Sequence, residues 1–329
     1  MTAPVAMAEL WRGGRVESIH LGHAVICGAD GEVEEAWGDP ETVIFPRSSC
    51  KMLQALPLVE SGAGANLTDR QLALACASHQ GAALHTAMVM RWLEELGMRE
   101  ADLRCGAHEP KDRAERDRLI RANEAPCQIH NNCSGKHAGF LTMNRHLKGD
   151  AEYVEPDHPL QVAIRAAFEE VTGEQSPGFG IDGCSAPNFA TSVAGLARSM
   201  AFFASADEAG DARNRAAVRL TRAMARFPEL VAGETRACTE LMRAMGARVA
   251  IKTGAEAVFV AILPEQKKGV AVKIADGGTR AAEAAICALL IRLGVLDAGH
   301  PAARKRLNAV QYNWRGIETG ILRTAPGFT

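Results

Sequence analysis

Strand-like segments occur at both ends of the chain and are separated by a long stretch of helical character. Near the N-terminus, residues 16–27 are apolar and β-branched enough for a strand. The Gly-Ala-Asp-Gly turn that follows lets residues 33–37 return as its partner, which predicts a β-hairpin. A second group of short strand-like segments precedes a helical pattern over residues 280–293; these segments are 249–251, 257–263 and 269–274. Strands at the two ends can bury their apolar faces together, so we expect one antiparallel sheet.

The middle of the chain predicts helices divided by loops rich in Gly, Pro, Asn and His. The helical segments are 72–76, 86–96, 160–171, 194–204 and 212–224. This order predicts an α+β fold, with an antiparallel sheet flanked by helices and a large helical insertion. We expect one catalytic unit over residues 1–329 with two lobes: an α/β lobe from 1–60 plus 248–329, and a mainly helical lobe over 61–247. A cleft between lobes is the expected place for an active site.

Composition and charge narrow the kinds of molecule that this protein is expected to bind. The chain has 329 residues, 47% of them hydrophobic, and a formal net charge of -2 from 37 basic and 39 acidic residues. This balance gives no electrostatic reason to expect nucleic acid or a membrane surface as a partner, and leaves a small-molecule substrate. No signal peptide or membrane-spanning segment is evident, and the nine cysteines lack the spacing of a disulfide framework. We therefore expect a cytoplasmic protein with reduced thiols.

The first motif with chemical content is Ser48-Ser49-Cys50-Lys51, which follows Pro46 where helical periodicity begins. Residues three apart share a helix face, so Ser48 and Lys51 can approach one another. A neutral lysine amine can accept the proton of a serine hydroxyl and so activate it as a nucleophile. The pattern is common in exposed helices and indicates little when it stands alone.

The second motif, Lys252-Thr253-Gly254, opens the late strand region. Its lysine could be the cation that favours the neutral form of Lys51, and its glycine lets a substrate approach the strand backbone. Together and in this order, the two motifs resemble those of serine β-lactamases and penicillin-binding proteins, which implies a fold of that kind. The third motif of those proteins, Ser-Asp-Asn, is absent.

The sequence also resembles a more specific family, the Rhizobium etli-type L-asparaginases. The resemblance is carried by four segments: 45–51 (FPRSSCK), 76–81 (CASHQG), 130–139 (HNNCSGKHAG) and 182–187 (DGCSAP). It covers essentially the whole chain, and it implies the same serine β-lactamase-like fold and the hydrolysis of L-asparagine in a homodimer.

The resemblance assigns roles to individual residues. It implies that Ser48 is the nucleophile and Lys51 its partner, and that Ser78 and Lys252 complete two Ser-Lys units. It also implies a Zn²⁺ ion held by Cys133, Lys136 and Cys184, which orients the substrate and does not supply the nucleophile. Residues with suitable charge or hydrogen-bonding capacity are further candidates for substrate binding; they are Arg47, His137, Asp182 and Cys238.

Three other functions remain open from the residues alone. A glutaminase would use the same chemistry, and one methylene in the substrate is worth only about 1–3 kcal/mol in a pocket. A β-lactamase or peptidase would be acylated by penicillin at Ser48. A non-catalytic zinc or thiol sensor built on a hydrolase fold would keep all its activities after Ser48→Ala.

Overall fold

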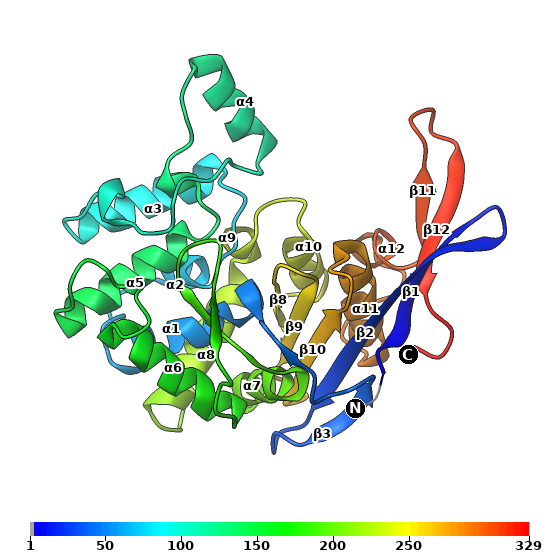
Figure 1. The fold of residues 1–329 in the computed structure, drawn as a ribbon, viewed down its shortest axis with the longest axis horizontal. Coiled ribbons are helices and arrows are strands. Elements are labelled where there is room, and N and C mark those ends of the chain that lie inside the picture. Colours follow the sequence, from blue (N-terminus) through cyan, green and yellow to red (C-terminus); the bar gives the residue numbers. More distant parts are fainter. Residues whose placement is uncertain (1–2, 329) are drawn as a thin grey trace. The chain divides into compact units, whose positions relative to one another are not determined.

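The protein is described by a computed structural model that covers residues 3–328 and divides into two compact units (Figure 1). The sheet unit comprises Met1–Ser49, Thr191–Ser205 and Glu240–Thr329. The helical unit comprises Cys50–Ala190 and Ala206–Thr239. The chain therefore passes between units directly after Ser49.

Within the described residues, the sheet unit is built on one antiparallel sheet of eight strands. Seven of them lie in the order β11-β12-β1-β2-β10-β9-β8, and β3 pairs with β2. Figure 1 shows β1 and β2 (blue) between the C-terminal β12 (red) and β10 (orange). Their bounds are β1 (Val5–Arg12), β2 (Arg15–Cys27), β3 (Val33–Trp37), β8 (Ala250–Thr253), β9 (Val258–Leu263), β10 (Lys268–Ile274), β11 (Ala309–Tyr312) and β12 (Glu318–Thr324).

Two helices pack on this sheet. Helix α7 (Val193–Ser205) contacts β2, β9 and β10, and α11 (Thr279–Arg292) contacts β1, β9, β10 and β12. Gly269 on β10 allows the close approach of α7, because a Cβ atom there would lie 2.1 Å from the Ala201 nitrogen. The unit also contains the short helix α12 (Pro301–Arg304) and the two-stranded pair β4 (Val43–Ile44) and β7 (Thr191–Ser192).

The helical unit is arranged around α1, whose residues from Lys51 to Leu58 are all buried. A helix buried on every side needs neighbours all round, and α1 contacts α2, α5, α6 and α8. The elements of this unit are α1 (Lys51–Glu60), α2 (Asp69–Ala75), α3 (Ala83–Glu95), η2 (Glu100–Asp102), α4 (Arg113–Ala122), η3 (Gln128–His130), α5 (Ser134–Leu147), α6 (Pro159–Thr172), β5 (Phe179–Ile181), β6 (Pro187–Phe189), α8 (Ala212–Arg226) and α9 (Pro228–Val231). The 3₁₀ helix η1 (Arg47–Cys50) and α10 (Ala237–Ala244) include residues of both units.

Helix α5 depends on two glycines for its packing. A Cβ atom on Gly135 would lie 2.5 Å from both Leu74 Cγ and the Leu74 carbonyl oxygen on α2. Gly139 faces Leu58 of α1 and the buried ring of Trp92 on α3. These contacts explain how a segment with glycine at positions 135 and 139 is helical, although glycine disfavours helix interiors by about 1 kcal/mol.

The predicted α+β class is confirmed, as are the antiparallel sheet and the large helical insertion. The structure adds strands to this sheet that we did not predict, namely β1, which precedes the first predicted strand, and the hairpin of β11 and β12. The predicted lobe ranges placed α1 with the sheet and α7 with the helices. In the structure α1 is surrounded by helices and α7 lies on the sheet.

None of the helices within residues 3–328 combines the length and the apolar character that crossing a bilayer requires.

Candidate active site

Ser48 lies in η1 of the sheet unit, a 3₁₀ turn and not the α-helix that the spacing predicted. The turn begins at Arg47, whose φ of 54° is in the left-handed region. Ser49 is fully buried, and its Oγ donates a hydrogen bond to the Pro46 carbonyl oxygen at 2.7 Å. Ser48 is partly exposed. Of the two adjacent hydroxyl groups, that of Ser48 is therefore the one accessible to a substrate.

The Lys-Thr-Gly motif lies beside this turn within the sheet unit. A Cβ atom on Gly254 would lie 2.7 Å from the Pro46 oxygen and 3.1 Å from the Ser49 nitrogen, so only glycine fits there. Lys252 is fully buried on β8, the last strand in the sheet order, and its Nζ donates to the Thr253 oxygen at 2.7 Å. Within the sheet unit, the structure thus places the Lys-Thr-Gly motif beside the turn that carries Ser48.

Lys51 is the first residue of α1 and is buried in the helical unit. Its Nζ donates to the Ala77 carbonyl oxygen, to Ser78 Oγ at 2.9 Å and to Cys133 Sγ at 3.1 Å. Ser78 lies in the loop after α2, where its backbone nitrogen donates to the Val231 oxygen. Lys51 therefore joins two segments that are distant from it in the sequence, the loop at residues 77–78 and the start of α5 at Cys133.

Next to this lysine, two thiols and a second lysine interact. Lys136 Nζ donates to Cys184 Sγ at 3.0 Å, and the Cys133 and Cys184 side chains are hydrogen-bonded. The bond from Cys133 holds the pKa of Cys184 well below its usual value, and the Lys136 cation acts in the same direction, against the effect of burial. The bond to Cys184 and burial raise the pKa of Cys133. The Lys136 cation, whose Nζ donates to Cys184 Sγ, thus favours the thiolate form of Cys184.

Burial alone would lower the pKa of Lys136, but the neighbouring sulfur atoms of Cys184 and Cys133 outweigh it and raise the pKa. Without a metal, Lys136 is therefore an ammonium paired with a thiolate. Its Nζ also lies 4.9 Å from the centre of the Phe140 ring, which favours a cation.

A second layer of polar residues, which sequence reasoning did not identify, holds these segments. Asn131 Oδ1 accepts from the Cys133 nitrogen at 2.8 Å, as expected for an Asn two residues before a turn amide. His79 Nδ1 accepts from the Gly81 nitrogen, so its proton is on Nε2, which lies 3.0 Å from Ser134 Oγ. Burial holds the pKa of His79 well below its usual value. A neutral His79 thus joins the Ser78 loop to the start of α5.

The four predicted substrate-binding residues lie in different surroundings. His137 follows Lys136 on α5 and is fully buried, and burial lowers its pKa. Asp182 is partly exposed, close enough to Lys136 to contribute to its raised pKa, and accepts from the Gly183 nitrogen. Arg47 belongs to the turn that carries Ser48, and Cys238 is buried on α10. The structure brings His137 and Asp182 to the thiol cluster.

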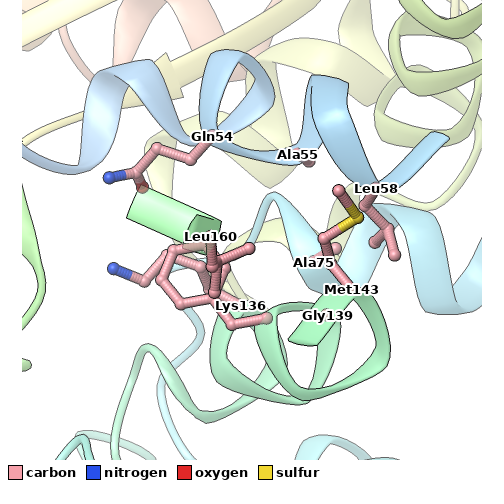
Figure 2. A pocket seen from close by; sticks show the side chains of 9 residues that line it. Gln54, Ala55, Leu58, Ala75, Lys136, Gly139, Met143 and Leu160 are labelled. Carbon is pink, nitrogen blue, oxygen red and sulfur yellow. The ribbon is translucent and has the colours of Figure 1, made fainter. Parts of the chain in front are cut away.

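A small cavity lies in the helical unit beside Lys136 (Figure 2). It has a volume of about 10 Å³, which is enough for roughly one water molecule. Figure 2 shows the ends of Gln54 and Lys136 extending to the same side of an otherwise apolar lining. The cavity is too small for an amino acid, so it is not the substrate pocket.

We expect Cys184→Ala to destabilise the metal-free protein by about 3–5 kcal/mol, because it leaves the Lys136 ammonium buried without its partner. The free energy of unfolding in urea, measured with a chelator present, checks this. The folded-state pKa of Cys184 is lowered, so its contribution is complete above the unfolded thiol pKa of about 8.5 and is lost as the pH falls through the folded value. The loss should therefore shrink toward acid pH.

The matched control is Cys105→Ala, also at a buried cysteine of the helical unit. Burial raises the pKa of Cys105 to about 12, so this thiol is neutral and its removal should cost only about 1 kcal/mol at any of these pH values. Equal losses of unfolding free energy in Cys184→Ala and Cys105→Ala would contradict the ion pair. If the ion pair exists, adding Lys136→Met to Cys184→Ala should restore stability, because it removes the unpaired charge.

The sequence comparison identifies the class of protein. Residues 8–324 match a family of enzymes that hydrolyse amides. That family is L-asparaginase II, and the chain belongs to it. The match confirms an amidohydrolase of the asparaginase type, whereas the narrower Rhizobium etli-type group stays a prediction. No curated protein matches the sequence.

Solved structures give distant likenesses. Mglu in its glutamate form is 13% identical with a TM-score of 0.49, over 84% of this chain and 61% of its own. A β-lactamase from Mycobacterium bovis is 14% identical with a TM-score of 0.45, over 84% of this chain and 95% of its own. The octameric penicillin-binding protein homologue from Pyrococcus abyssi is 12% identical with a TM-score of 0.41, over 90% of this chain and 80% of its own. The chain thus spans less than two thirds of the length of Mglu in that form.

Proposed function

We propose that the protein hydrolyses L-asparagine to L-aspartate and ammonia through an ester on Ser48. The proposal is supported most by the surroundings of Lys51, a buried lysine three residues after an accessible serine, with a second hydroxyl, Ser78 Oγ, 2.9 Å from its Nζ. In a chain of the L-asparaginase II family, this arrangement fits a serine nucleophile served by a lysine.

The reaction would run in two steps. Ser48 Oγ attacks the carbon of the side-chain amide, the C–N bond breaks, and ammonia leaves with a proton. Water then attacks the ester carbon, which releases aspartate and returns the proton to Ser48. In its neutral form Lys51 accepts the Ser48 proton, and Ser78 relays a proton to or from Lys51 through their hydrogen bond. We also assign Lys252 to the other Ser-Lys unit, because it belongs to the motif whose Gly254 packs on the turn that carries Ser48.

We propose that Cys133, Lys136 and Cys184 hold Zn²⁺. The donor set suits zinc, because two sulfur atoms and an amine nitrogen already interact at one place. Binding would release the protons of Lys136 and Cys133, so that the amine and the thiolates can coordinate the ion. Among residues 3–328, no group of three or more His, Cys, Asp or Glu could hold a metal, so the lysine amine is an essential part of this set. When bound, the ion would supply a positive charge that orients the substrate.

Zinc content tests this directly. We expect the purified protein to retain about one zinc per chain after dialysis, and Cys133→Ala and Cys184→Ala to lose it, because each removes a ligand. The control Cys105→Ala, which removes a neutral thiol of the same unit, should retain the metal. The site would be excluded if the wild type bound no zinc even when zinc is supplied in excess. It would also be excluded if all variants retained zinc equally.

The substrate carries an α-carboxylate and an α-ammonium group, so its binding site needs side chains that complement both charges. We assign Arg47 and His137 to the α-carboxylate and Asp182 to the α-ammonium group, in keeping with their charge and hydrogen-bonding capacity. Cys238 is a further residue of the substrate site in this proposal.

Ammonia release from L-asparagine, with L-glutamine measured in parallel, tests the function. Hydrolysis of asparagine, together with a mass increase on acid quenching that maps to the peptide with Ser48, is the expected result. Release from glutamine alone would make the protein a glutaminase. Release from neither amino acid would refute the proposal.

We further propose a cytoplasmic homodimer. None of the nine cysteines is in a disulfide and eight of them are buried, as suits a reducing compartment. Light scattering during size-exclusion chromatography measures the molar mass and should give that of a dimer. The mass of a monomer would refute the proposed dimer.

A further inference from the structure

The two thiols beside Lys136 have a chemistry of their own in the metal-free protein. Cys133 is the residue before α5, and Cys184 lies in the turn between β5 and β6. Their side chains are hydrogen-bonded to each other, and neither is in a disulfide. Two sulfur atoms already in contact are placed to form a covalent bond once one of them is oxidised.

The surroundings make the two sulfur atoms chemically different. Lys136 Nζ donates to Cys184 Sγ at 3.0 Å, and this cation favours the thiolate, which is the form that oxidants attack. The bond to Cys184 and burial raise the pKa of Cys133, so Cys133 keeps its proton. The pair therefore combines a nucleophilic thiolate with a neighbouring thiol that can resolve its oxidised form.

Other buried thiols of the chain lack this combination. Burial raises the pKa to about 12 at four of them, which are Cys27, Cys50, Cys105 and Cys287. Cys27, Cys105 and Cys287 each donate to a backbone carbonyl oxygen. Neutral thiols react slowly with peroxides, so an oxidant should select Cys184 over these four.

We propose that Cys184 and Cys133 form an oxidation site at which a hydroperoxide, such as hydrogen peroxide, closes a reversible disulfide. The Cys184 thiolate attacks one peroxide oxygen, the O–O bond breaks, and hydroxide leaves, which gives a sulfenic acid on Cys184. Cys133 then attacks the Cys184 sulfur, and the S–O bond breaks. The hydroxyl group leaves with the Cys133 proton as water. The two sulfur atoms together lose two electrons, and the peroxide gains them.

The disulfide would disable the surrounding site. It uses both sulfur atoms of the proposed zinc set, and it changes the Cys133 sulfur to which Lys51 Nζ donates at 3.1 Å. We therefore expect the oxidised protein to bind no zinc and to release no ammonia from asparagine, and dithiothreitol to restore both. These two effects rest on the zinc site and the function proposed above, whereas the disulfide itself does not.

Peptide mapping of the metal-free protein tests the disulfide. After hydrogen peroxide and blocking of the remaining thiols, trypsin should give a cross-link between peptides 122–136 and 166–198, which dithiothreitol cleaves. Cys127 shares the first peptide with Cys133, so Cys127→Ser should give the same cross-link. Absence of the cross-link, or a bond from Cys184 to Cys105 in its place, would overturn the proposal. This result needs no variant of the cluster to fold.

The rate of cross-linking tests the role of Lys136. Lys136→Met should slow it about tenfold, because Cys184 loses the cation that favours its thiolate. Lys111→Met, at an exposed loop lysine of the same unit, should leave the rate unchanged. Equal rates in Lys136→Met and the wild type would overturn the assignment of Cys184 as the attacking thiolate.

Zinc and activity measurements separate this proposal from the earlier ones. Saturating zinc should slow the cross-linking about tenfold or more, because the ion would occupy both sulfur atoms. Equal rates with and without zinc would refute the zinc ligands and leave the oxidation site intact. A protein that forms the disulfide but never releases ammonia from asparagine would refute only the proposed function.

Discussion

Ser48→Ala should reduce ammonia release from L-asparagine by about 10⁴- to 10⁶-fold, the range seen when a nucleophile or its partner is removed from a serine hydrolase. The proposed ester forms on Ser48 Oγ, and the variant has no atom in that position that can attack the amide. The acid-quenched ester should be absent as well. Initial rates at saturating asparagine, with mass spectrometry of the quenched protein, measure both effects.

The adjacent Ser49→Ala is a closely matched control. Its hydroxyl is fully buried and already donates to the Pro46 oxygen, so we expect a loss of stability of about 1 kcal/mol and activity near that of the wild type. If Ser49→Ala were as inactive as Ser48→Ala, the turn and not a particular hydroxyl would be what matters. Full activity of Ser48→Ala would exclude Ser48 as the nucleophile.

Lys51→Met should lower kcat/KM by about 10²- to 10⁴-fold, the usual contribution of a positioned base. Methionine fills a similar volume in the buried site but removes the group that hydrogen-bonds to Ser78 and Cys133. Lys111→Met, at an exposed loop lysine of the same unit, should have no effect. Urea unfolding of both variants separates a loss of catalysis from a loss of structure.

Lys51→Arg distinguishes a base from a fixed charge. Arginine keeps the positive charge but cannot give up its proton, so a base at position 51 predicts that Lys51→Arg is also inactive. An active arginine variant would show that Lys51 acts only as a cation.

Much of the secondary structure could be predicted from local sequence. The helices α3, α6, α8 and α11 follow the apolar periodicity, and Pro46 correctly marks the point where the strand-rich beginning gives way to helical turns. Helix α5 could not be predicted, because its glycines argue against a helix until Leu74 and Trp92 are known to pack against them. The turn at Ser48 is 3₁₀, a distinction that periodicity does not make.

The candidate site was less accessible to reasoning from sequence. Cys133 and Lys136 are three residues apart, so their proximity follows from helix geometry. Cys184 is 48 residues beyond Lys136 and meets it only through the tertiary fold.

The position of Trp92 makes the helical unit separately observable by fluorescence. Of the four tryptophans, Trp11, Trp37 and Trp314 belong to the sheet unit, and Trp92 alone belongs to the helical unit, buried against Gly139 of α5. A protein with phenylalanine at the other three positions would emit from a single indole beside the helix that carries Lys136 and His137. The emission of this protein would show whether zinc, an oxidant or a substitution loosens the packing around the site before the sheet unit unfolds.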